Sequence, residues 1–222
     1  MQRVHSWPEE RSVVHIARRS ERCTVLGPGV RAVLWVQGCP FRCPGCVASE
    51  TLPFVGGTPE QVDDLAVQLC ALQEIEGITF SGGEPLAQAP ALCALIDSIR
   101  ERRPDVTFMS YTGYRIEHLQ SRGTREQKNL LSKLDILVDG PYVREQHTDL
   151  RWRGSSNQRV LFLSSRYSRL TDTLKERDTS IEFEFGADGS LHWMGIPPEG
   201  FRDAFEHEMN QRGIELTQSE GA

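Results

Sequence analysis

The sequence predicts an α/β fold in which helices cover a mostly parallel sheet. Short apolar strands alternate with amphipathic helical segments between residues 31 and 164. These strands are apolar throughout, as expected when both faces of a parallel sheet are buried. About five such strands precede residue 165, too few for a closed eight-stranded barrel. We therefore expect an open, partial parallel β/α barrel, with its chemistry at the carboxyl ends of the strands.

Each element follows from a local pattern. Segment 58–73 begins with Thr58 as a cap and Pro59 at the first helical position, and apolar residues then recur at helical spacing. The other expected helices are amphipathic and cover 89–103, 115–121 and 126–134. The expected strands are apolar runs that cover 31–37, 77–81, 106–110, 135–140 and 159–164.

The pattern changes after residue 165. Segment 181–195 alternates apolar and polar residues on both sides of an Ala-Asp-Gly turn, which predicts a β-hairpin. Segment 198–213 predicts a helix, and the last residues are expected to fray. We therefore divide the chain into a core with an N-terminal extension, residues 1–165, and a small hairpin-plus-helix appendage, residues 166–222.

Composition narrows the class of protein. The 222 residues, 38% of them hydrophobic, are enough for one substantial core. A net charge of −6 argues against a nucleic-acid-binding protein. No apolar stretch is long enough to span a membrane, and the first residues lack the apolar core of a signal peptide. A cytoplasmic, reducing location is expected, where clustered cysteines indicate metal binding or catalysis.

The string CPFRCPGC places Cys39, Cys43 and Cys46 in a C-x3-C-x2-C loop after strand 31–37. A structural zinc site needs four ligands, and no nearby Cys or His supplies the fourth. Catalytic zinc could use three ligands and stays open as an alternative. A 4Fe–4S cluster usually takes four thiolates, so three would leave one iron free to chelate a substrate. Incidental cysteines are disfavoured, because this loop of prolines and glycines has no helical face to bury.

The cysteine loop, together with the strand-end segment ITFSGGEP (78–85), resembles the radical S-adenosylmethionine (SAM) superfamily. Four further strings, in collinear order over about residues 23–165, resemble the activating proteins of anaerobic ribonucleotide reductase. They are VLGPGVRAVLWVQGCPFRCPGC, SYTGY, LDILVDGPYV and WRGSSNQR. The sequence departs from the superfamily at Gly45, where many members carry an aromatic residue, and at Val47, where this subfamily often does.

The resemblance implies a radical SAM oxidoreductase with a 4Fe–4S cluster. The three cysteines would hold three irons, and the fourth iron would chelate SAM. A flavodoxin- or ferredoxin-like protein would donate an electron. SAM would then yield a 5′-deoxyadenosyl radical that takes a hydrogen atom from a glycine of a large glycyl radical enzyme. Modification of a peptide or a biosynthetic small molecule on the same scaffold stays as an alternative, and a non-enzymatic electron-transfer module is a third.

The resemblance also implies a SAM site, with no catalytic residue beyond that site and the cluster. Gly82, Gly83 and Glu84 would hold the methionine end, and Pro85 would end the strand. Polar groups expected to reach SAM or the substrate, or else to cap turns and tie loops, are Ser110, Thr112, Asp139, Arg153 and Asn157. Gly45 and Val47 are included because they border the third cysteine.

Overall fold

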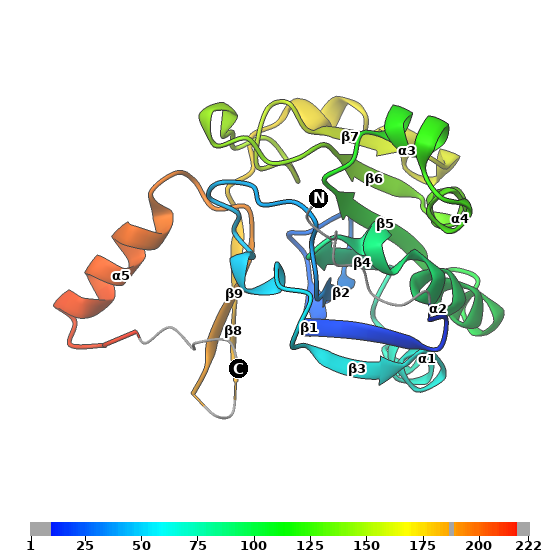
Figure 1. The fold of residues 1–222 in the computed structure, drawn as a ribbon. Helices are drawn as coiled ribbons and strands as arrows, with labels where there is room; N and C mark the ends of the chain where they lie inside the picture. The colour runs from blue at the N-terminus through cyan, green and yellow to red at the C-terminus, as the bar shows by residue number, and fades with distance from the viewer. Residues whose placement is uncertain (1–9, 187–188, 217–222) are drawn as a thin grey trace, which may run out of the picture.

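The computed structural model describes residues 10–186 and 189–216. Seven strands form one mixed sheet in the order β3-β1-β2-β4-β5-β6-β7 (Figure 1). Their bounds are Val13–Cys23 for β1, Arg31–Val36 for β2, Thr58–Gln61 for β3, Gly77–Gly82 for β4, Thr107–Thr112 for β5, Ile136–Asp139 for β6 and Arg159–Phe162 for β7. The expected α/β class with a largely parallel sheet is confirmed. Curvature of this sheet into a partial barrel stays a prediction.

The centre of the sheet is parallel. Strands β2, β4, β5 and β6 pair in parallel, so their carboxyl ends meet at one edge. The connections between β3, β4, β5 and β6 contain four helices: α1 (Val62–Ala71), α2 (Ala89–Arg102), α3 (Ile116–Arg122) and α4 (Arg125–Lys133). Helical connections let each strand return in the same direction as the one before.

Alternate residues of the strands face two different cores. Leu34, Phe80 and Phe108 are fully buried in the core on the helix side of the sheet. Their neighbours Trp35 and Met109 point to the opposite face, where they join two smaller cores. This period of two is the ordinary geometry of a strand. Both faces of the parallel strands are therefore buried, as the apolar sequence runs predict.

Strand β7 was expected to be parallel, and this expectation is wrong. It pairs antiparallel with β6, with Asp139 opposite Arg159 and Ile136 opposite Phe162. The connection 140–158 contains only a single 3-10 turn, Arg144–Gln146, instead of a crossover helix. A parallel return needs such a crossover, so the chain comes back alongside β6 in the opposite direction.

Two elements near the amino end also differ from expectation. Residues 58–61 form β3 instead of the first helical turn, because they pair antiparallel with residues 13–16 of β1. The helix α1 accordingly begins at Val62. Strand β1 was not predicted, since its alternation of buried residues is interrupted by charged residues and by register shifts against β2. It pairs antiparallel with β2 and lengthens the sheet on that side.

The segment after β7 packs on the face of the sheet opposite α1–α4, where Tyr167 joins the core of Met109 and Met194 joins the core of Trp35. Two 3-10 helices, Ser165–Leu170 and Asp172–Lys175, lead to the antiparallel pair β8 (Ile181–Phe185) and β9 (Leu191–Gly195). Helix α5 (Phe201–Gln211) projects beyond this pair (Figure 1). Two residues of the expected hairpin turn, Ala187 and Asp188, lie outside the described residues, as do 1–9 and 217–222.

The hairpin contributes to a core with the main sheet. Met194 of β9 is buried together with Cys23, Leu26, Val33 and Trp35. Among the described residues, no helix has the length and apolar character needed to cross a membrane.

Candidate active site

The expected site elements gather where the parallel strands end. The cysteine loop follows β2, the Gly82-Gly83 turn ends β4, and the turn at 112–114 ends β5. The connection that carries Arg144 follows β6. Parallel pairing brings these four strand ends to one edge of the sheet. Residues that are far apart in the sequence, such as Gly83 and Arg144, therefore border the same loop.

Backbone hydrogen bonds close the base of the cysteine loop. Gly38 N donates to Thr51 O at 2.8 Å, and Cys39 N donates to Leu52 O at 3.0 Å. The Gln37 amide adds a bond to Pro53 O at 2.7 Å. Residues 38–52 therefore form a loop whose two ends are hydrogen-bonded to each other at the edge of the sheet, and all three cysteines lie within it.

The Gly-Gly turn is in direct contact with the first end of this loop. Gly83 N donates to Val36 O at 2.8 Å, and Glu84 N donates to Gly38 O at 2.9 Å. A Cβ added at Gly83 would lie 2.4 Å from Gly38 O, and one at Gly82 would lie 2.7 Å from Trp35 Cα. Gly82 also has a φ of 90°, a conformation that favours glycine. Glycine is thus needed at position 83 for the turn to pass so close to Gly38, and at position 82 for β4 to pass so close to β2.

The three thiols are half-buried and in one loop. Burial, together with the charge of Glu84, raises the pKa of Cys39 to about 12, and burial raises the pKa of Cys46 as well. Within the ranges that the structure describes, no three His, Cys, Asp or Glu side chains are gathered closely enough to hold a metal ion. Binding would therefore require the thiols to converge and to lose their protons. Soft thiolates on a glycine- and proline-containing loop are a donor set that suits an iron–sulfur cluster.

Gly45 and Val47, on either side of Cys46, stand at the two positions where an aromatic residue was expected from the resemblance. Gly45 has a φ of 77°, and the Arg144 side chain lies against it: a Cβ there would be 2.8 Å from Arg144 Nε. The positive φ favours glycine at this position, whereas the flexible Arg144 side chain could move away from a Cβ. Val47 is 56% exposed, so it is open to contact with a ligand or a partner.

Glu84 is buried with only 1% of its surface exposed, and its carboxylate is bound inside the protein. Its Oε1 accepts hydrogen bonds from Thr112 Oγ1 at 2.8 Å and from Leu86 N at 3.0 Å. Its Oε2 accepts one from Gly113 N at 2.8 Å. Burial raises the pKa of Glu84 to about 7, and these three hydrogen bonds oppose the rise. Pro85, the next residue, starts a short 3-10 helix instead of extending the strand.

The hydroxyls predicted on β5 are bonded within the protein. Ser110 is fully buried, and its hydroxyl donates to Tyr111 O at 3.0 Å. Thr112 donates to Glu84. The intervening residue, Tyr111, points to the opposite face, where its buried hydroxyl has no hydrogen-bond partner among the described residues. The sequence could have indicated that Tyr111 faces away from Ser110 and Thr112, because successive side chains of a strand point to opposite faces of the sheet.

Asp139 also has protein partners. Its carboxylate is fully buried and accepts hydrogen bonds from Arg159 Nε at 2.9 Å and from Arg159 Nη2 at 2.5 Å. Arg115 lies 3.5 Å away, and Ile116 N donates to it at 2.8 Å. These contacts join the end of β6 to the start of α3 and to β7. They leave little of this carboxylate for a ribose.

Arg153 and Asn157 lie in the connection between β6 and β7. Arg153 Nη2 donates to Leu174 O, which directs its side chain toward the 3-10 helices after β7. Asn157 Nδ2 donates to Pro141 O at 2.8 Å. Arg153 Nε and Asn157 Oδ1 are buried atoms without a hydrogen-bond partner among the described residues. Contact of either residue with SAM stays a prediction.

The sequence did not indicate a role for Phe41 of the cysteine loop or for Arg144, which lies beside this loop. The Phe41 ring meets Tyr114 edge-on with the centroids 4.8 Å apart, and a Cβ at Gly113 would lie 2.5 Å from Phe41 Cδ2. Phe41 thus connects the loop to the turn that follows β5. Its position between two cysteines was the available signal, but its partner is 73 residues away.

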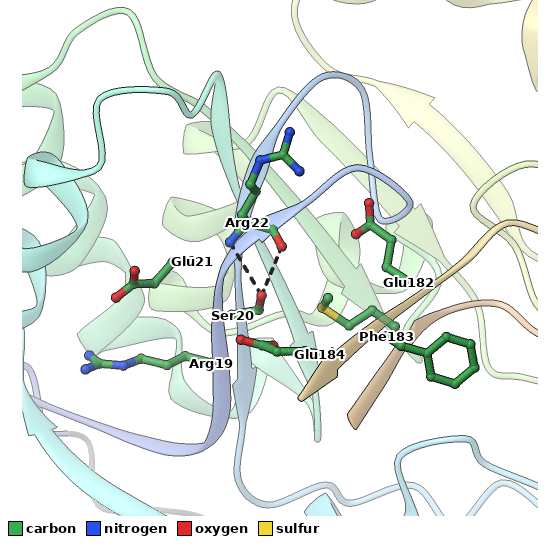
Figure 2. Close-up of a pocket in the computed structure, with 8 residues that line it drawn as sticks. Arg19, Ser20, Glu21, Arg22, Glu182, Phe183 and Glu184 are labelled. Atoms are coloured by element: carbon green, nitrogen blue, oxygen red, sulfur yellow. Dashed lines mark hydrogen bonds between the residues drawn. The ribbon is translucent and has the colours of Figure 1, made fainter. Parts of the chain in front are cut away.

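A separate pocket of about 510 Å³ lies between β1 and the hairpin (Figure 2). Its lining includes Arg19, Arg22, Glu182 and Glu184, and Ser20 bonds to the backbone of Arg22 beside it (Figure 2). None of the expected site residues lines this pocket. The geometry therefore places the candidate site at the strand ends, where the cysteine loop meets the Gly-Gly turn.

Comparisons with known proteins show the family to which the chain belongs. A family model described as a 4Fe-4S single cluster domain matches residues 25–161. The anaerobic ribonucleoside-triphosphate reductase-activating protein of Salmonella typhi is 36% identical over 143 residues, which are 61% of this chain and 90% of that protein. The pyruvate formate-lyase-activating enzyme of Clostridium pasteurianum is 34% identical over 83 residues, 35% of each chain.

A solved structure, QueE from Escherichia coli, covers 46% of this chain and 52% of its own at 15% identity and a TM-score of 0.36, too distant a likeness to carry an argument. The sequence-based predictions of the family, of an enzyme, and of a 4Fe–4S cluster and SAM as cofactors are confirmed. The chain belongs to the 4Fe–4S single cluster domain family, within the radical SAM group that includes the activating proteins of anaerobic ribonucleoside-triphosphate reductase.

Proposed function

We propose that this protein activates a glycyl radical enzyme of the anaerobic ribonucleotide reductase type. The observation that carries this proposal is the match to the activating protein of Salmonella typhi, which extends over 90% of that relative. The adjacency of the cysteine loop and the Gly82-Gly83 turn supports it, because cluster and SAM must be bound side by side.

In this proposal Cys39, Cys43 and Cys46 hold three irons of the cluster. The main chain at Gly82 and Gly83 receives the methionine end of SAM, since the absence of side chains there permits close approach. When bound, a cluster reduced by a flavodoxin- or ferredoxin-like protein would supply the one electron that cleaves the sulfonium–ribose bond of SAM. This cleavage would release methionine and a 5′-deoxyadenosyl radical able to take a hydrogen atom from a glycine of the partner.

We propose that residues 1–165 form the core that carries this reaction and that residues 166–222 form a C-terminal appendage. The family match ends at residue 161, which supports a boundary near this point. The hairpin packs against Trp35 and Leu26, so this appendage is also part of the folded body.

The test is anaerobic reconstitution with iron and sulfide, reduction, and incubation with SAM and the anaerobic ribonucleotide reductase of the same genome. We expect 5′-deoxyadenosine to form and a glycyl radical doublet to develop in the electron paramagnetic resonance (EPR) spectrum of the reductase. A reconstituted, reduced protein that leaves SAM intact would contradict the proposal at its first step.

A second candidate is a radical SAM enzyme that modifies a peptide or a small molecule. Two observations favour it: Val47 stands exposed beside the third cysteine, and the chain after residue 161 lies beyond the family match. In this case 5′-deoxyadenosine still forms, but no glycyl radical develops on the reductase. Deuterium transfer from labelled candidate substrates into 5′-deoxyadenosine then identifies the substrate.

A further inference from the structure

The carboxylate of Glu84 links the ends of two strands. Glu84 directly follows the Gly-Gly turn of β4, and two of its three hydrogen-bond donors, Thr112 Oγ1 and Gly113 N, lie at the end of β5, both at 2.8 Å. Hydrogen bonds from several donors to one buried carboxylate are strong and directional. The end of β4 is therefore held in a fixed position relative to the turn at 112–114.

The turn at 112–114 also contacts the cysteine loop. The open face of Gly113 lies against the Phe41 ring, with only 2.5 Å between the position of a Cβ and Phe41 Cδ2. The Tyr114 ring also packs against the Phe41 ring, edge-on and with the ring centroids 4.8 Å apart. Phe41 lies between Cys39 and Cys43. Glu84 therefore contacts the start of the loop through its own backbone bond to Gly38 O, and the middle of the loop through Gly113 and Phe41.

The same contacts leave the Glu84 side chain unsuited to bind a ligand directly. A carboxylate offers about four lone-pair sites, three of which accept hydrogen bonds from the protein. Only 1% of the residue is exposed. One lone-pair site therefore remains, but an ammonium group of SAM could reach it only if the residues that bury the carboxylate moved aside.

We propose that Glu84 is a positioning residue, which fixes the cysteine loop relative to the Gly-Gly turn through Thr112, Gly113 and Phe41 instead of binding SAM with its own carboxylate. This inference rests on the proposed function and deepens it. It assigns the contact with the SAM amino group to the main chain of the turn. It also gives Thr112 a role in SAM affinity that requires no contact between Thr112 and SAM.

The test uses Thr112→Val, which removes the donated hydrogen bond and keeps the shape of the side chain. We expect Thr112→Val to fold and to retain its iron, but to bind SAM about tenfold more weakly, as expected for loss of a hydrogen bond to a charged group. The change that SAM causes in the EPR spectrum of the reduced cluster should shrink in parallel. Thr112→Ser keeps the hydroxyl and should restore both readouts.

Thr171→Val is a matched control, because its hydroxyl donates only to the nearby Ser168 O. It should leave SAM binding unchanged. If Thr112→Val binds SAM as the wild type does, with an identical EPR change, the inference is overturned. Failure of the wild-type protein to assemble a cluster or to bind SAM would instead overturn the proposed function itself.

A second pair of variants guards against loss of folding in Thr112→Val. Gly113→Ala places a Cβ against the Phe41 ring and should weaken SAM binding in the same way. Phe41→Leu shortens that ring, so Gly113→Ala combined with Phe41→Leu should bind SAM more tightly than Gly113→Ala alone. A double variant no better than Gly113→Ala would contradict the proposed path from Glu84 to the cysteine loop.

Discussion

Gly83 is the residue at which the Gly-Gly turn and the cysteine loop come closest. A Cβ at this position would lie 2.4 Å from Gly38 O, and main-chain atoms cannot move aside as a flexible side chain can. We expect Gly83→Ala to destabilise the protein by roughly 1–3 kcal/mol. It should also weaken SAM binding, since the loop and the turn must separate. Thermal unfolding and equilibrium binding measure the two effects, and unchanged SAM affinity would contradict this account of the turn.

The cysteines provide a second prediction at the scale of single residues. Cys43→Ala removes one proposed iron ligand and should abolish SAM cleavage and lower the iron content after reconstitution. Cys70→Ala is the control, because Cys70 is a free cysteine of α1 and packs beside the helix-side core. It should keep its iron and its SAM cleavage. Equal losses in both variants would show that the iron is not held by the cysteine loop.

Among the elements, α3 and β7 are joined by an ion pair that responds to pH. Arg159 Nη1 and Nη2 each donate to the Glu117 carboxylate at 2.9 Å, and this lowers the pKa of Glu117 from 4.5 to about 2. A lowered pKa in the folded state contributes stability above the unfolded value, and that contribution disappears as the pH falls from about 5 to about 2.

Glu117→Gln should therefore be slightly less stable than the wild type at pH 7 and equally stable near pH 2. The difference is small because the Glu117 side chain is 63% exposed. Unfolding by denaturant across this pH range measures it. A stability difference that grows toward low pH would contradict the assignment.

The hairpin after β7 provides another prediction at this scale. Met194 is 4% exposed and packs with Trp35 and Val33 of β2 and with Leu26 of the connection before it. We expect Met194→Ala to destabilise the protein by about 2–5 kcal/mol. Phe185→Ala, on the partner strand with Phe185 78% exposed, should change the stability by no more than about 0.5 kcal/mol. Similar effects of the two variants would mean that the hairpin is not part of the core.

At the scale of the whole molecule, the arrangement of the site could be predicted from the sequence, but its internal bonding could not. Cys39 and Gly82 each follow an apolar strand, and parallel strands end at one edge, so their proximity follows from the pattern. Thr112, a partner of Glu84, and Arg159, a partner of Asp139, come from segments 28 and 20 residues away, and local periodicity does not reveal them. Strand β1 was missed because its charged residues and register shifts break the alternation.

The antiparallel direction of β7 was hidden for a related reason. Its apolar run resembles those of the parallel strands, and only the connection 140–158, which lacks a crossover helix, distinguishes it.

The most direct test of the whole account is electron–nuclear double resonance on the reduced protein with SAM labelled by ¹⁵N in its amino group. We expect about four irons per chain and a ¹⁵N coupling that shows the amino nitrogen bound to the cluster. A single zinc per chain, or a cluster without this coupling, would contradict the account.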